Sequence, residues 1–272
     1  MDAFFSVLIT AYNAETTIIK TLTSISNQTY ANYEIVLVDD GSADRTIELV
    51  RQLVETKGIR NLRLLTPGRL GRVKALNFGV SQSKGEWIAI CDADDLWHPR
   101  KLEVQAGLLS SADKNLVVLA TRTLVVHFDE EVTHAPLPSA TPKLTSISLK
   151  KMLTRTRVCH SSCVIKKEYC VYDESRVYQD DTELFLRLLT QKMGIAICDR
   201  VLTYRVIHEN QNFEARNITK FIWSSYLLRN KYILLAGKYY LLPFNVFKLG
   251  YGLLPRSFRM EVQKMRAKKW FN

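Results

Sequence analysis

Three uninterrupted apolar runs of strand length, at residues 4–10, 34–40 and 87–92, constrain the fold most strongly. Strands that face water on one side alternate apolar and polar residues, so continuous runs indicate a sheet covered on both faces. Residues 15–26 and 44–57, between these runs, carry apolar side chains at helical spacing. The pattern predicts an α/β fold.

A further short strand at 62–66 and a helix at about 71–81 complete a β-α-β-α-β-α-β order within residues 1–100. This order predicts a doubly wound, mainly parallel, right-handed sheet. The second half is less regular, and we place no domain boundary before about residue 215. Its expected elements are an extended segment at 115–131, a loop with three prolines at 136–146, helices at 147–154 and 181–192, and strands at 162–166, 194–199 and 202–207.

Polar side chains follow the three long strands, in the segments "TAYN" (10–13), "VDDGS" (38–42) and "CDADD" (91–95). Ligands of such sheets bind at the carboxyl ends of the strands, so one cleft is expected to hold all three segments. Asp92 and Asp94 form an Asp-x-Asp pair that suits Mg²⁺ or Mn²⁺. The alternative is a solvated turn that caps a following helix.

Four segments resemble glycosyltransferase family 2 in order and spacing: "SVLITAYNAE", "EIVLVDDGSADRT", "GRVKALNFGVSQSKGEWIAICDADDLWHPRKLEVQ" and "DESRVYQDDTELFLRLL". The resemblance covers about residues 4–210. It implies a GT-A fold with a catalytic domain at 1–214, divided into a nucleotide-binding half (1–100) and an acceptor-binding half (101–214). A basic, mostly helical segment at 215–272 follows.

The resemblance implies that Thr10, Ala11 and Tyr12 lie under the nucleotide base, with Tyr12 offering an aromatic face. It also implies that Asp40 accepts a hydrogen bond from the imide N–H of uracil, while Asp39 orients the loop. As alternatives, Tyr12 is a core aromatic, and Asp40 forms an Asx-turn or caps the helix beginning near Asp44.

Arg72 and Lys74 lie beside the family position for a basic contact to the base or the diphosphate, with a plain surface charge as the alternative for both. Asp92 is expected at the ribose and Asp94 at the metal ion, Mn²⁺ or Mg²⁺. Asp95 either assists the metal or caps a helix.

The segment "QDDTELFLRLL" places Asp181 at the family position of the catalytic base. Asp180 departs slightly from the family pattern, which usually has Glu there. The residues also fit a capping box, with Asp180 as N-cap and Glu183 as its partner, and the two interpretations are compatible. Asn77 is expected to support a loop, His208 is a candidate near the diphosphate, and His160 is a weaker one.

The implied reaction is an inverting single displacement from a nucleotide-diphosphate sugar, with a UDP-sugar favoured. The acceptor would be a hydroxyl of a glycan or lipid-linked glycan in envelope polysaccharide synthesis. Two competing functions are a nucleotidyltransferase, for which a Gly-rich phosphate loop is missing, and a non-catalytic sugar-nucleotide-binding protein.

The net charge of +11 is concentrated after residue 220, where ten basic residues accompany one acidic residue. The remaining chain is nearly neutral and has no nucleic-acid-binding motif, so we expect no nucleic-acid partner. Residues 221–272 mix aromatic and basic side chains without an apolar run long enough to span a bilayer. They favour a peripheral segment on an anionic membrane. The alternative is a helical subdomain that packs on the catalytic core or a dimer partner, which leaves oligomerisation open.

The five cysteines are odd in number and irregularly spaced, which favours free thiols in a reducing compartment. A zinc site built on "CHSSC" is a weak alternative, because no second ligand pair accompanies it. The first residues lack a basic region before a short apolar run, so we expect a strand there rather than a signal peptide. The expected location is the cytoplasm, peripheral on the inner face of the cell membrane.

Overall fold

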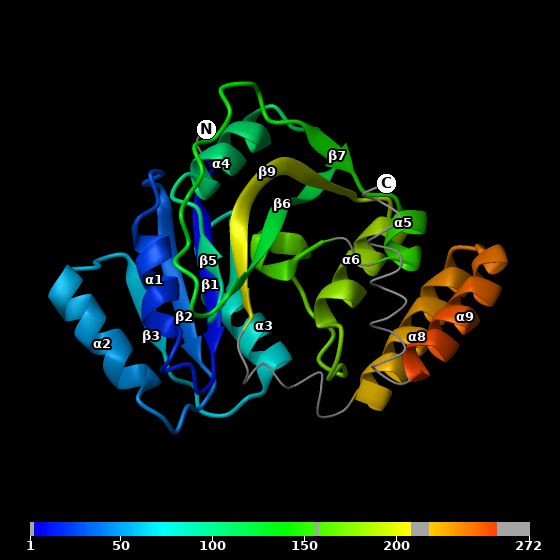
Figure 1. Ribbon diagram of the computed structural model, residues 1–272, viewed down its shortest axis with the longest axis horizontal. Coiled ribbons are helices and arrows are strands. Elements are labelled where there is room, and N and C mark those ends of the chain that lie inside the picture. Colours follow the sequence, from blue (N-terminus) through cyan, green and yellow to red (C-terminus); the bar gives the residue numbers. More distant parts are fainter. Residues whose placement is uncertain (1–2, 156–157, 208–217, 255–272) are drawn as a thin grey trace.

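The computed structural model describes residues 3–155, 158–207 and 218–254. In these residues a nine-stranded sheet runs through the molecule (Figure 1). Its order is β3-β2-β1-β4-β8-β6-β9-β5, and β7 pairs with β9 outside this path. The strands are β1 (Phe5–Ala11), β2 (Tyr33–Asp39), β3 (Leu62–Leu65), β4 (Trp87–Asp92), β5 (Leu96–Trp97), β6 (Leu116–His127), β7 (Leu144–Ser146), β8 (Val164–Lys166) and β9 (Gly194–Ile207).

The expected helices are present close to their expected residues, and the described C-terminal residues are helical as well. The 3₁₀ helices are η1 (His160–Ser162), η2 (Lys167–Tyr169) and η3 (Tyr239–Leu241). The α-helices are α1 (Ile18–Ser26), α2 (Thr46–Lys57), α3 (Arg72–Gln82), α4 (Lys101–Ser110), α5 (Leu149–Thr154), α6 (Asp180–Thr190), α8 (Ile218–Leu235) and α9 (Leu242–Leu253).

The predicted fold class is confirmed. Strands β3, β2, β1 and β4 are parallel neighbours, joined by helices as the continuous apolar runs indicated. The second half mixes directions, since β8 is antiparallel to both β4 and β6, whereas β6 and β9 are parallel. The sequence therefore predicted the regular half of the sheet and only the irregularity of the other half.

One long strand, β9, replaces the two short strands expected at 194–199 and 202–207. Arg200 and Val201, which separated the two expected strands, lie within β9. Asp199 N donates to Lys143 O at 3.0 Å, and Lys143 N donates to Asp199 Oδ1 at 3.0 Å. These two hydrogen bonds join β9 to the residue before β7, and they pair the backbone N–H groups of Asp199 and Lys143 without a turn.

Two hydrophobic clusters fill the two faces of the sheet. One contains side chains of α1, α2 and α4, and the other contains side chains of α3, α5, α6 and α8. Leu228, Tyr232 and Ile233 of α8 are buried in the second cluster. Helix α8 is thus part of the core, as the helical-subdomain alternative predicted, while the predicted boundary near residue 215 lies outside the described residues.

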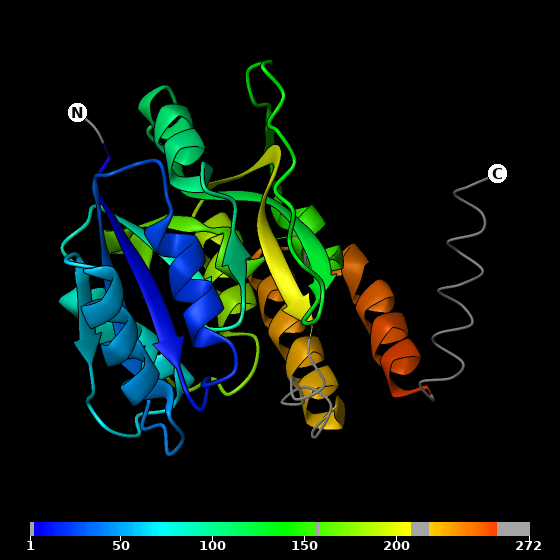
Figure 2. The same cartoon turned by 60° about the vertical axis from the view of Figure 1, so that its left-hand side comes forward.

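Helices α8 and α9 lie side by side at one end of the molecule in both views (Figures 1 and 2). Asn245 of α9 joins them, because its Nδ2 donates to Tyr226 O at 3.0 Å and to Asn230 Oδ1 at 2.8 Å. Among the helices that the structure describes, none combines the length and the apolar character needed to span a bilayer.

Lys101, at the start of α4, is completely buried. Its Nζ donates to Gln105 Oε1 at 2.8 Å and lies 3.8 Å from the centre of the Trp97 ring. Burial lowers the pKa of this ammonium from 10.5 to about 7.

We expect Lys101→Met to remove a pH dependence of stability. Between about pH 7 and 10.5 the unfolded chain binds a proton at this lysine that the folded chain lacks. The free energy of unfolding should therefore rise with pH, by up to about 1.4 kcal/mol per pH unit from this residue. Urea titrations of both proteins across that window measure the difference in free energy of unfolding between the variant and the wild type. This difference should shift in favour of the wild type as pH rises. A difference that is constant with pH would contradict the lowered pKa.

Candidate active site

The strand register brings the predicted motifs to one edge of the sheet. Thr10 on β1 pairs with Asp92 on β4, and Ala11 pairs with Asp39 on β2. Asp40 N then donates to Ala11 O at 2.8 Å. Residues from three separate segments of the sequence are thereby fixed next to one another at the carboxyl ends of parallel strands.

The loops after β1 and β2 are hydrogen-bonded to each other. Asn13 Oδ1 accepts from Ala43 N at 2.9 Å, and Asn13 N donates to Ser42 Oγ at 2.9 Å. Asp39 is buried and its Oδ2 accepts from Ser42 N at 2.9 Å, an arrangement that fits its expected part in orienting the loop. Gly41 has a φ of 74°, a left-handed conformation that glycine adopts without strain.

Tyr12 is 50% exposed, so the alternative of a core aromatic is wrong. The guanidinium of Arg69 lies 3.7 Å from the centre of its ring, and the same guanidinium pairs with Asp40. Asp40 Oδ1 also accepts from Leu70 N at 2.7 Å and Gly71 N at 2.9 Å. Asp40 therefore anchors the loop before α3.

The capping alternative for Asp40 is also wrong. At the start of α2 it is Asp44 Oδ1 that accepts from Thr46 N, at 3.0 Å. The sequence reasoning missed Arg69, although a signal was present, because Arg69 lies between Gly68 and Gly71, whose φ angles are 85° and 89°. Glycines adopt positive φ without strain, so they allow the tight loop that carries Arg69 to Asp40 directly before the helix.

Arg72, at the first position of α3, connects the two halves of the site. Its Nη2 lies 3.0 Å from Asp92 Oδ1, and its Nε lies 3.5 Å from Asp180 Oδ2. The carboxylate of Asp92 is the main cause of the raised pKa of this guanidinium. Burial opposes ionisation of Asp92, but Arg72 and His160 hold its pKa below the usual value. Lys74 is exposed on α3 and forms no hydrogen bond or ion pair with the described residues, which fits its surface alternative.

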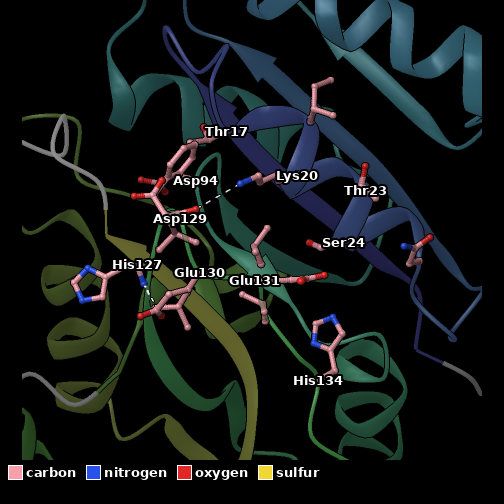
Figure 3. Close-up of a pocket in the computed structure, with 17 residues that line it drawn as sticks. Thr17, Lys20, Thr23, Ser24, Asp94, His127, Asp129, Glu130, Glu131 and His134 are labelled. Carbon is pink, nitrogen blue, oxygen red and sulfur yellow. Dashed lines mark hydrogen bonds between the residues drawn. The ribbon is translucent and has the colours of Figure 1, made fainter.

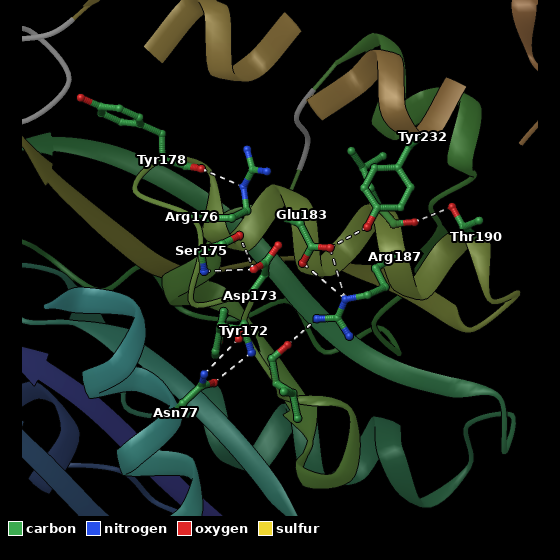
Figure 4. Close-up of polar contacts among 12 residues, drawn as sticks. Asn77, Tyr172, Asp173, Ser175, Arg176, Tyr178, Glu183, Arg187, Thr190 and Tyr232 are labelled. Atoms are coloured by element: carbon green, nitrogen blue, oxygen red, sulfur yellow. Dashed lines mark hydrogen bonds and ion pairs between the residues drawn. The ribbon is translucent and has the colours of Figure 1, made fainter. Parts of the chain in front are cut away.

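The start of α6 differs from the predicted capping box. Gln179 is the N-cap, with a left-handed φ of 59°, and its side chain makes no capping hydrogen bond. Glu183 instead pairs with Arg187 at 3.3 Å and accepts from Tyr232 of α8 at 2.6 Å (Figure 4). The capping box is therefore wrong, because Arg72 draws Asp180 toward β4 and Glu183 joins α6 to α8.

Asp181 follows at the same helix start and is partly buried. Its Oδ1 accepts from Thr182 N at 2.6 Å. Burial raises the pKa of this carboxyl and Asp180 adds to the rise, while His160 and Arg72 oppose it. Because Asp180 forms an ion pair with Arg72, Asp181 is the one of these two neighbouring aspartates that is better suited to accept a proton.

The turn after β4 directs its carboxylates differently. Asp95 is buried, and its Oδ1 accepts from Val206 N on β9 at 3.1 Å. Strand β5 follows it directly and α4 begins only at Lys101, so Asp95 does not cap a helix. Burial, with the charges of Asp92 and Asp94, raises the pKa of Asp95. Its predicted part in metal binding stays a prediction.

Asp94 lines a pocket of about 470 Å³ between α1 and the segment after β6. Figure 3 shows Asp94 and Asp129 at one end of this pocket and His134 at the other. Four carboxylates and one lysine line the pocket, so its charge is negative and it suits a metal-bound or uncharged group better than a bare phosphate. The charged lining residues are Lys20, Asp94, Asp129, Glu130 and Glu131.

Within the described ranges, no group of three or more His, Cys, Asp or Glu side chains is arranged to hold a metal ion by itself. Mg²⁺ and Mn²⁺ sites that use a substrate diphosphate need only one or two protein carboxylates. A partly exposed Asp94 at the rim of a negatively charged pocket fits such a site.

Among the described residues, Asn77 and His160 complete the surroundings. Asn77 Oδ1 accepts from Tyr172 N at 2.9 Å, and its Nδ2 donates to Tyr172 O, so its expected support of a loop is confirmed (Figure 4). His160, treated as a weak candidate, lies against Arg72. His208 lies outside the described residues. All five cysteines are free thiols.

Comparison with known proteins gives a family match. Residues 6–170 match the family described as Glycosyl transferase family 2. The amylovoran biosynthesis glycosyltransferase AmsB of Erwinia amylovora is 35% identical over 111 residues, which are 40% of this chain and 36% of that protein. The UDP-Glc:alpha-D-GlcNAc-diphosphoundecaprenol beta-1,3-glucosyltransferase WfgD of Escherichia coli is 35% identical over 109 residues, 40% of this chain and 42% of that protein. The chain aligns with less than half the length of each.

Solved structures share the fold. TarS of S. aureus (residues 1–349), in complex with UDP-GlcNAc, has a TM-score of 0.66 at 16% identity, covering 89% of this chain and 72% of that one. The mannosyltransferase PcManGT from Pyrobaculum calidifontis, in complex with GDP-Man and Mn²⁺, has a TM-score of 0.66 at 18% identity, covering 98% and 81%.

Proposed function

The chain belongs to glycosyltransferase family 2, and on this basis we propose that it transfers a sugar from a nucleotide-diphosphate sugar to a hydroxyl of a glycan or lipid-linked glycan. The observation that carries the proposal is the position of Arg72, whose guanidinium contacts Asp92 at a strand end and Asp180 at the start of α6. These two contacts support a single site that includes Asp92, which is expected to bind the donor, and the start of α6, which carries the expected base.

On the donor side, we propose that the base lies near Tyr12 and Asp40 and the ribose near Asp92. A UDP-sugar is our preferred donor, because Asp40 and Tyr12 match the family pattern for uracil. The TarS structure is a complex with UDP-GlcNAc and the PcManGT structure is a complex with GDP-Man, so related folds accept both nucleotides. Arg72 and Lys74 would contact the diphosphate from α3.

We propose an inverting single displacement. Asp181 removes the proton from the acceptor hydroxyl as that oxygen attacks the anomeric carbon from the face opposite the nucleotide. The bond from this carbon to the diphosphate breaks, and the nucleoside diphosphate leaves with the electron pair. Mn²⁺ or Mg²⁺, held by Asp94 and Asp95, would supply Lewis-acid stabilisation of the leaving diphosphate. Arg72 adds a fixed positive charge on the same side.

A thermal-shift panel tests the donor proposal. Each nucleotide sugar is added with Mn²⁺, and a ligand at a hundred times its Kd should raise the free energy of unfolding by about 2.7 kcal/mol. We expect UDP-sugars to give the largest shift. A shift by nucleoside triphosphates but by no nucleotide sugar would favour the nucleotidyltransferase instead.

For the acceptor, we propose a lipid-linked glycan. The protein would reach it while bound to the anionic inner face of the cell membrane. WfgD carries diphosphoundecaprenol in its name, and we propose the same class of acceptor for this chain. The support lies in α8 and α9. Residues 218–254 contain no acidic residue, and many of their apolar side chains are exposed. The most exposed are Leu227, Leu234, Leu235, Tyr239, Tyr240, Val246 and Phe247, each more than half accessible.

We expect Leu235→Glu, Tyr240→Glu and Phe247→Glu together to weaken binding to phosphatidylglycerol-containing vesicles by roughly tenfold or more, since apolar burial and charge attraction are both lost. Sedimentation of the full chain measures this. Truncation before α8 is unsuitable, because α8 is part of the core. The control, Gln52→Glu with Lys57→Glu on α2, removes the same charge from another face. Equal vesicle binding by the triple variant and the wild type would contradict membrane association through α8 and α9.

A further inference from the structure

His160 is a buried residue that the reaction described above does not use. It is 5% exposed, and its ring packs edge-on against Tyr172 and Phe185. Its Nε2 lies 2.7 Å from Tyr172 Oη, and its Nδ1 lies 3.4 Å from Arg72 Nη2. The imidazole therefore joins the aromatic core to the guanidinium that spans the site.

The partners of His160 assign its tautomer. A guanidinium N–H donates and cannot accept, so the Nδ1 that faces Arg72 must carry a lone pair. The proton of the neutral ring is then on Nε2, which donates to the hydroxyl of Tyr172. Cys170 Sγ lies 3.6 Å from the same hydroxyl and can donate a weak second hydrogen bond.

Two nitrogens of the Arg72 guanidinium make its three contacts with Asp92, His160 and Asp180. Nη2 meets Asp92 and His160, and Nε meets Asp180. Within the described residues Nη1 makes no hydrogen bond, and the side chain is 48% exposed. A guanidinium held in this way presents its remaining N–H groups to solvent in a fixed direction.

We propose that His160 is a positioning residue for the transfer reaction: its Nδ1 lone pair fixes the guanidinium of Arg72 for contact with the donor diphosphate, and Tyr172 fixes the tautomer. The inference rests on the proposed function, because it needs a donor at Arg72. A side chain that is already oriented loses less conformational freedom when the ligand binds, so donor affinity rises.

His160→Phe keeps an aromatic ring but removes both nitrogens, whereas His160→Asn keeps an acceptor atom near the position of Nδ1. We expect His160→Phe to raise the Kd of UDP, titrated with Mn²⁺, by about tenfold, and His160→Asn to recover part of the loss. His98→Phe is the matched control, since His98 is 6% exposed and packs against His134 away from Arg72.

A double-mutant cycle with Arg72→Ala separates positioning from packing. If His160 acts through Arg72, His160→Phe changes the Kd less than about twofold once Arg72 is absent. The same tenfold loss in the Arg72→Ala background would overturn the inference and leave the proposed function intact.

The ligand-free protein gives a second readout. Nitrogen NMR of His160 should show the proton on Nε2 and an unprotonated Nδ1, with the Nδ1 signal changing in Arg72→Ala. A proton on Nδ1 would overturn the inference. If the wild type binds neither UDP nor any UDP-sugar, the proposed donor fails, while the tautomer still decides whether His160 holds Arg72.

Discussion

Asp181→Asn is expected to lower kcat by at least about a hundredfold while the donor's Kd changes little, because general-base contributions typically reach about 10²- to 10⁴-fold. The donor is assigned to Tyr12, Asp40, Asp92 and the metal, and none of these contacts uses Asp181. Burial raises the pKa of Asp181 above its ordinary value of 3.8. As the pH is lowered, the wild-type rate should therefore begin to fall at a pH higher than an ordinary aspartate would give. Steady-state transfer kinetics and donor titrations measure both effects.

Asp180→Asn is the matched control and should have a different signature. Its carboxylate faces Arg72 at 3.5 Å, so the substitution weakens an ion pair rather than a cap. We expect a change in donor affinity that exceeds the change in kcat. If Asp180→Asn abolishes turnover and Asp181→Asn does not, the base is Asp180 and the assignment must move by one residue.

Asp94→Ala should abolish the Mn²⁺-dependent part of donor affinity and leave the fold intact. Asp94 is partly exposed at the rim of a pocket, so its loss removes a ligand without opening a cavity in the core. Titration of UDP with and without Mn²⁺, together with a thermal melt, measures the two parts of this expectation.

The control for Asp94→Ala is Asp129→Ala, which removes a carboxylate from the lining of the same pocket but not from the Asp-x-Asp segment. It should retain most of the metal-dependent affinity. An unchanged response to Mn²⁺ in Asp94→Ala would contradict the assignment of the metal to this residue.

The sequence predicted the parallel half of the sheet well, because its strands are buried on both faces and leave continuous apolar runs. The same runs placed Thr10, Asp39 and Asp92 at strand ends, and the register of β1 with its neighbours makes them adjacent. That adjacency follows from parallel topology, which the alternation of strands and helices had already indicated.

The contacts of single side chains could not be predicted in this way. Arg69 reaches Asp40 and Tyr12 only because the loop before α3 passes the end of β2, where Leu70 N and Gly71 N donate to Asp40, and no periodicity marks such a loop. His160 and Arg72 are 88 residues apart in sequence. Their contact depends on how β8 inserts between β4 and β6, which belongs to the irregular half of the fold.

The capping box shows a local rule overridden by tertiary contacts. Asp180 and Glu183 have the right spacing, but Arg72 and Tyr232 offer them charged and hydrogen-bonding partners from other elements. Partners of this kind outweigh a cap worth about 1 kcal/mol. Likewise, composition showed only that the C-terminal segment mixes aromatic and basic residues, whereas α8 places some of those aromatics in the core and others on the surface.

Product analysis tests the central proposal most directly. The full chain is incubated with Mn²⁺, a panel of nucleotide sugars and a glycan or lipid-linked glycan acceptor, and the phosphorus and proton NMR spectra of the products are recorded. Glycosyl transfer predicts release of a nucleoside diphosphate, with the anomeric configuration of the new bond opposite to that of the donor. Release of pyrophosphate, or transfer with retained configuration, would contradict the proposed reaction.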